Sequence, residues 1–141
     1  MSIWKVQVTA EELNANKNED MVSYLGIEFT EVGEDFISGK MPVDHRTRQP
    51  FGILHGGAHV VLAETLGSLA ANLVIEPNKG HAVGLDINSN HLKSIKEGYV
   101  YGVARPIHIG GATQVWEIRI SDENNNLLNI SRLTMFVVKN K

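Results

Sequence analysis

The pattern of hydrophobic and polar positions predicts one long buried helix in the middle of the chain. Between residues 58 and 73, apolar side chains recur at helical spacing and form a single stripe. The stripe consists of Ala58, Val61, Leu62, Thr65, Leu66, Leu69 and Leu73. The roughly opposite side carries Ala63, Gly67 and Ala70, which are small enough to let other backbone approach closely. A helix that is apolar or small nearly all round is buried in a core, and only Glu64 interrupts this one with a charge.

Shorter segments on both sides of this helix predict strands and turns. Residues 9–24 indicate one or two short helices, the first opened by a capping box of Thr9 and Glu12. Strands are expected at 27–31, 35–41, 82–91, 97–107, 113–121 and 127–138. A polar loop occupies residues 42–54, and Pro77 and Gly80 break the long helix near residue 76.

The order of these elements predicts the fold class. The last four strands are joined by short connections, which favour antiparallel neighbours in a meander. Within the first of the four, Val83, Leu85 and Ile87 should face one way and Asp86, Asn88 and Asn90 the other. Two strands, one long helix and four strands give an α+β fold, with an antiparallel sheet around the helix. With 141 residues, the chain should form one domain, residues 1–141.

Composition and charge exclude several classes of function. The 13 Lys and Arg against 16 Asp and Glu give a formal charge of -3, which offers no electrostatic basis for binding nucleic acid or a membrane surface. The chain has no cysteine, so a disulfide framework, a thiolate nucleophile and a zinc–thiolate site are excluded. No apolar run is long enough to span a bilayer, and the first residues do not resemble a secretory signal. The expected location is therefore cytoplasmic.

Glu64 is unusual on so apolar a helix. Burying a carboxylate without partners costs several kcal/mol, so this side chain either points into solvent or has a chemical role. Gly56 and Gly57 at the start of the helix would present backbone N–H groups to a developing negative charge, and Gln49 could add an amide donor. Partial burial would make Glu64 a better base near neutral pH. Together these groups predict acyl transfer, with the carbonyl group polarised by the start of the helix that carries Glu64.

Several segments together resemble one enzyme family. The pattern begins with the loop sequence Gln49-Pro-Phe-Gly-Ile-Leu-His-Gly-Gly and continues with Ala63-Glu64 and Gly67-Ser68. The segments Gly84-Leu-Asp-Ile-Asn-Ser-Asn-His91 and Gln114-Val-Trp116 follow in order. In these motifs the chain closely resembles the hotdog-fold acyl-CoA thioesterases over nearly its whole length. Within them it is similar to the PaaI-like branch, which contains the Arthrobacter-type 4-hydroxybenzoyl-CoA thioesterase and the 1,4-dihydroxy-2-naphthoyl-CoA hydrolases.

This resemblance implies both an assembly and a reaction. The long helix would be wrapped by a curved sheet, and two subunits would join their sheets edge to edge, with dimers pairing into a homotetramer. The reaction would hydrolyse an aromatic or medium-sized acyl-CoA to the free acid and coenzyme A. Coenzyme A is then part of the substrate, and no cofactor is implied. The resemblance also places Gln49 and Glu64 of one site on different subunits.

The resemblance assigns catalytic roles to four residues. Glu64 either attacks the thioester carbonyl or activates a water molecule, and the family's members are described in both ways. The backbone N–H of Gly56 binds the oxyanion, and Gln49 holds or polarises the carbonyl group. His55 orients its neighbours and is not the main base.

A second set of residues is expected to bind the substrate by the same resemblance. This set consists of Gly57, Ser68, Asn90, His91, Lys93, Gly110 and Arg132. Ser68 would position water, whereas Lys93 and Arg132 would meet the phosphates of coenzyme A. Relatives often carry Ser or Arg after the glycine of the turn that is Gly110-Gly111-Ala112 here. The phosphates must therefore be held from elsewhere in this chain, or more loosely.

Two other functions are compatible with the same motifs. The same fold could serve an acyl-thioester hydratase or dehydratase, or a non-catalytic acyl-CoA-binding module. A binding module would gain little from a buried carboxylate beside an oxyanion site. His55 and His59 have a spacing that could bind zinc, but there is no H-E-x-x-H motif, and His59 lies away from Glu64 on the helix. We therefore predict no metal site, and the missing G-x-S-x-G motif argues against an α/β-hydrolase.

Overall fold

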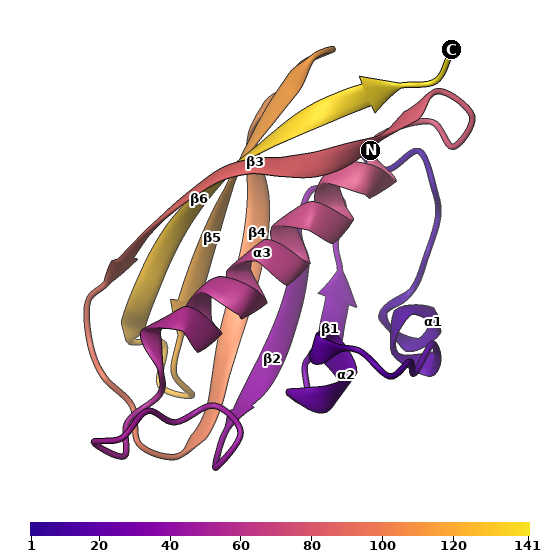
Figure 1. Ribbon diagram of the computed structural model, residues 1–141. Helices are drawn as coiled ribbons and strands as arrows, with labels where there is room; N and C mark the ends of the chain where they lie inside the picture. The colour runs from indigo at the N-terminus through magenta and orange to yellow at the C-terminus, as the bar shows by residue number, and fades with distance from the viewer.

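A curved six-stranded antiparallel sheet wraps one long helix in the computed structural model, which describes all 141 residues (Figure 1). The helices are α1 (Ala10–Ala15), α2 (Met21–Tyr24) and α3 (Gly56–Leu73). The strands are β1 (Glu28–Val32), β2 (Ile37–Val43), β3 (Gly80–His91), β4 (Gly98–Ile109), β5 (Thr113–Ser121) and β6 (Leu127–Lys139). Every predicted strand is confirmed with small shifts at its ends, and the α+β class is confirmed.

The order of the strands differs from the predicted four-strand meander. The sheet runs β1-β2-β4-β5-β6-β3, so β3 lies at an edge beside β6 and not beside β4. The connection from β3 to β4 spans residues 92–97. Six extended residues reach about 20 Å, more than the roughly 14 Å of three strand spacings, so a short connection does not force neighbours to pair. Only β4, β5 and β6 form a meander.

Helix α3 is buried by the concave face of the sheet and contacts β2 through β6. Leu62 and Leu66 are fully buried, as the stripe predicts. Val61 and Leu69 of the same stripe are only half-buried, whereas the small residues Ala63 and Ala70 are fully buried. The buried face is thus turned towards the small side chains, because the sheet curves close to the helix there.

The edge strand β3 contains a bulge that corrects its predicted facing. The register with β6 shifts between Gly84 and Asp86, which leaves Leu85 as the extra residue. Ahead of the bulge Ala82 is buried and Val83 is exposed, whereas beyond it Ile87 packs against the core. The prediction that Val83, Leu85 and Ile87 share one face is wrong, because a bulge reverses the alternation of a strand.

The motif residues Gln114 and Trp116 are buried and hydrogen-bonded in the core. Trp116 is fully buried, stacks on Trp4 with 6.3 Å between ring centroids, and donates from Nε1 to Oε1 of Gln114 at 2.8 Å. Gln114 in turn donates to the backbone oxygen of Ala71 in α3 at 3.2 Å. These bonds satisfy polar groups that would be costly to bury alone. None of the helices is both long and apolar enough to cross a membrane.

Candidate active site

The start of α3 carries one backbone N–H group without a partner. His55 is the N-cap residue, and its Nδ1 accepts a hydrogen bond from the N–H of Gly57 at 2.7 Å. The N–H groups of Ala58 and His59 both donate to the oxygen of His55. The first N–H groups of a helix have no acceptor within the helix. Of these groups, only the N–H of Gly56 is left to bind an acceptor from elsewhere. A helix N-terminus with a free amide favours a negative charge.

A cavity of about 340 Å³ lies at this helix start. Its polar lining comes from Gln49, Gly56, His59, His91, Lys93 and Ser94. The structure thus brings together four residues predicted for the site: Gln49 from the loop, Gly56 from α3, and His91 and Lys93 from the end of β3. Gln49 accepts from the N–H of Phe51 through Oε1, which leaves its amide nitrogen as a donor.

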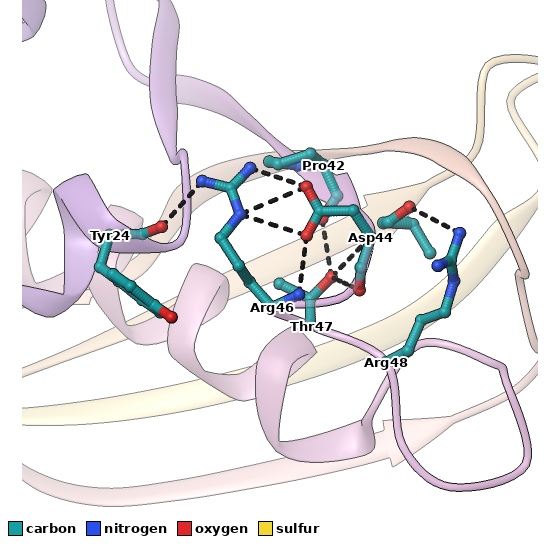
Figure 2. A network of polar contacts seen from close by, with 7 residues as sticks. Tyr24, Pro42, Asp44, Arg46, Thr47 and Arg48 are labelled. Atoms are coloured by element: carbon teal, nitrogen blue, oxygen red, sulfur yellow. Dashed lines mark hydrogen bonds and ion pairs between the residues drawn. The ribbon is translucent and has the colours of Figure 1, made fainter.

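The loop that carries Gln49 is held by a network of ionic and polar contacts (Figure 2). Arg46 pairs with Asp44 at 2.7 Å and donates to the backbone oxygen of Tyr24 at 2.8 Å. The side-chain hydrogen bond from Arg46 lowers the pKa of Asp44 from 3.8 to about 2. The buried Thr47 donates to the oxygen of Pro42 at 2.9 Å, which fixes the turn. These contacts therefore hold the backbone of the loop that carries Gln49.

Glu64 lies against the edge strand and is exposed in the single chain. A Cβ placed on Gly84 would stand 2.7 Å from Oε2 of Glu64, so a side chain there would move the carboxylate from its present position. The predicted partial burial of Glu64 is not found. The reason is the position of β3 at the edge, where this chain has no further element to cover the carboxylate.

Glu64 and the free amide of Gly56 lie well apart along α3. They are eight residues apart on a continuous helix, which corresponds to about 12 Å along its axis. An oxyanion donor and an attacking oxygen on one carbonyl group can be separated by at most about 7 Å. Within one subunit, the Glu64 side chain and a water molecule would have to bridge the difference, which favours a Glu64 from a second subunit. The prediction that Glu64 faces a carbonyl group polarised by its own helix stays a prediction.

Comparison with known proteins identifies the family. Residues 51–129 match the thioesterase superfamily. The chain is 50% identical over 136 residues to a 1,4-dihydroxy-2-naphthoyl-CoA hydrolase of Escherichia coli (strain K12), covering 96% of this chain and 99% of the relative. This chain belongs to the thioesterase superfamily. It is also 46% identical over 136 residues to the proofreading thioesterase EntH of Cronobacter turicensis, covering 96% and 98%.

The crystal structure of a thioesterase from Haemophilus influenzae shares this fold. It superposes with a TM-score of 0.93 at 52% identity, covering 97% of this chain and 95% of that one. The predicted hotdog fold is thereby confirmed, and the protein is a thioester hydrolase. No group of three or more His, Asp and Glu side chains lies close enough together to hold a metal ion.

Other predicted site residues of this thioesterase lie apart from the cavity. Asn90 and Arg132 line a separate depression of about 330 Å³, on the face of the sheet turned away from α3. Gly110 forms the turn between β4 and β5. The whole length of β4, about 40 Å if fully extended, separates this turn from residues 92–97, which contact the chain just before α3. Ser68 is half-buried one turn beyond Glu64. Within one subunit these residues do not line the same cavity, and their roles stay predictions.

Two residues near the cavity were missed as site residues. Asn129 is fully buried on β6, and its side chain bonds His91. His59 is buried with no hydrogen-bond partner for Nδ1, and its ring centroid lies 5.8 Å from that of His91. A polar residue at an inward-facing position of a strand was the sequence signal for Asn129, since such a residue needs buried partners.

His59 should make the thioesterase sensitive to acid. Burial, and then the neighbouring His91, lowers the pKa of His59 from 6.5 to about 4. Between pH 6.5 and 4 the unfolded chain binds a proton that the folded chain does not, so stability is lost as pH falls through this window. The expected loss is about 3 kcal/mol. Urea unfolding of wild type and His59→Phe at pH 7 and pH 4.5 measures it.

The variant should show a smaller loss between the two pH values than wild type does. His108→Phe, at an exposed histidine on β4, is the matched control and should keep the wild-type pH dependence. Equal slopes for wild type and His59→Phe would contradict the prediction.

Proposed function

We propose that this thioesterase hydrolyses acyl-CoA substrates with aromatic or medium-sized acyl groups, at sites shared between two subunits. The observation that carries the proposal is the free N–H of Gly56 opening into a cavity that Gln49 and Lys93 also line. Such an amide suits the oxygen of a polarised thioester, and Lys93 suits an anionic carrier such as coenzyme A. The names of both relatives support the reaction, and the name of the 1,4-dihydroxy-2-naphthoyl-CoA hydrolase supports an aromatic acyl group.

The reaction proceeds through a tetrahedral oxyanion. Glu64 either attacks the carbonyl carbon or removes a proton from a water molecule that attacks it. The negative charge that develops on the oxygen is stabilised by the N–H of Gly56, and one such donor is worth about 2.7–4 kcal/mol. The carbon–sulfur bond then breaks, and the thiolate of coenzyme A leaves and takes up a proton. If Glu64 has attacked, a water molecule then hydrolyses the anhydride between Glu64 and the acyl group, which releases the acid and restores the carboxylate. On either route water supplies the second oxygen of the acid, so no cofactor is consumed.

Glu64 is supplied by a second copy of the chain across the edge strand β3. The two edges of the sheet differ: at β1, the side chain of Asn14 bonds both the N–H and the oxygen of Phe29, at 2.8 and 2.7 Å. No such block covers β3, which is 12 residues long and exposes Val83 and Leu85. A long open edge with apolar side chains is a template for pairing with another strand. Pairing there would also cover Glu64, and dimers could associate further into a tetramer in the cytoplasm.

A panel of acyl-CoA substrates tests this function. Thiol release should be fastest for hydroxybenzoyl-, dihydroxynaphthoyl- or medium-chain acyl-CoA, compared as kcat/KM ratios with acetyl-CoA as the small control. Absence of thiol release from every member would contradict the proposal. Hydration of crotonyl-CoA without thiol release would instead favour the hydratase alternative.

A further inference from the structure

A buried polar cluster joins the sheet to the cavity at the start of α3. Asn129 on β6 is fully buried and donates from its amide nitrogen to the hydroxyl of Ser89 on β3 at 2.8 Å. Its amide oxygen accepts from the hydroxyl of Ser131 at 3.0 Å, and the two hydroxyl groups lie 2.9 Å apart. Every polar atom of the Asn129 side chain is therefore engaged in a hydrogen bond.

The same amide nitrogen determines where His91 carries its proton. It lies 3.0 Å from Nδ1 of His91. An amide nitrogen can only donate, so Nδ1 must accept and the proton of the neutral ring is on Nε2. The partner of one ring nitrogen thus sets the function of the other.

Nε2 of His91 points to the start of α3. A Cβ placed on Gly56 would stand only 2.8 Å from this nitrogen. Because the Cβ position and the backbone nitrogen are joined to the same Cα, Nε2 and the N–H of Gly56 lie within roughly 5 Å of each other. One oxygen atom can accept hydrogen bonds of ordinary length from two donors so placed.

The ring of His59 lies beside the ring of His91. It faces His91 at an interplanar angle of 39° and is buried. Its lowered pKa keeps it neutral above about pH 4, so it does not repel His91 as a cation. His91 is therefore held between a neutral ring and an amide that fixes its tautomer.

We propose that His91 contributes a second oxyanion donor, Nε2–H, beside the N–H of Gly56, and that Asn129 is the positioning residue that holds His91 in this tautomer. This inference rests on the proposed thioesterase reaction at this cavity. It assigns a role in the chemistry to Asn129, which does not line the cavity. It also explains why residue 56 is glycine, since any side chain would displace His91.

Three substitutions test the two roles. His91→Leu removes the donor and should lower kcat about 100-fold, the loss typical of one oxyanion donor. His91→Gln keeps an N–H donor near the position of Nε2 and should restore kcat to within about 5-fold of wild type. Asn129→Leu has a similar volume but no donor, and kcat should fall about 10-fold with little change in KM, because the ring loses its fixed tautomer. His108→Leu, at an exposed histidine on β4 away from the proposed interface strand, is the matched control and should keep wild-type kinetics.

Nitrogen-15 NMR of the histidine rings measures the tautomer directly. His91 should be a single Nε2–H tautomer in wild type and a mixture in Asn129→Leu. An Nδ1–H tautomer in wild type, or a tautomer unchanged in Asn129→Leu, would overturn the role of Asn129. Equal kcat for His91→Leu and His91→Gln would overturn the donor role.

The spectra need no substrate, so they are independent of the reaction. If wild type releases no thiol from any acyl-CoA, the proposed function fails while the tautomer is still measured. His91 is exposed, so its variants should fold, and they keep the donor role testable even if Asn129→Leu does not fold.

Discussion

Replacing Glu64 with alanine should lower kcat about 10²- to 10⁴-fold, the usual contribution of a positioned base or nucleophile. Both versions of the proposed mechanism need this carboxylate, so neither can proceed without it. The fold should be unaffected, because Glu64 is exposed and forms no ion pair within its own chain. Steady-state thiol release measures the loss of activity, and thermal unfolding checks the fold.

Glu76→Ala is the matched control for this substitution. Glu76 is an exposed carboxylate just beyond the end of α3, with only a surface ion pair to Lys79 at 3.4 Å. It should keep wild-type kcat. A wild-type kcat for Glu64→Ala would contradict the proposed mechanism.

Mixing two impaired variants should restore activity. Gln49→Ala alone should lower kcat about 10-fold through loss of a carbonyl contact, and Glu64→Ala should be nearly inactive. When equal amounts are unfolded and refolded together, one quarter of the shared sites should pair an intact Gln49 with an intact Glu64. Activity should therefore reach about a quarter of wild type, well above the average of the two variants.

Each variant refolded alone provides the baseline for this experiment. Activity of the mixture equal to the mean of those baselines would mean that each site is built within one subunit. The separation of about 12 Å along α3 between Gly56 and Glu64 would then have to be bridged by the Glu64 side chain and a water molecule.

Local signals in the sequence were sufficient for the elements of the fold. The helical stripe around Leu62 and Leu66 predicted α3, and the turns before Thr113 and after Ser121 predicted β5 at its observed ends. The capping box of Thr9 and Glu12 is confirmed at the start of α1. Each of these features depends on residues close together in the chain, where spacing and turn chemistry decide the outcome.

Features that depend on distant contacts were not predictable in this way. The place of β3 at the edge follows from its pairing with β6, and the bulge at Leu85 follows from the same register. The motif around Gly56 located the cavity. The exposure of Glu64 could not be predicted from helical periodicity, because the spacing of residues along a helix does not show which strand lies at an edge of the sheet.

Two glycines accommodate side chains on other elements in their present positions. Gly56 leaves room for the ring of His91, and Gly84 leaves room for the carboxylate of Glu64. A chain with a smaller residue at 91, or a shorter one at 64, could carry alanine opposite it without a clash. Substitutions should accordingly appear in pairs among relatives, 56 with 91 and 84 with 64, and such covariation would reveal the geometry of the site without any structure.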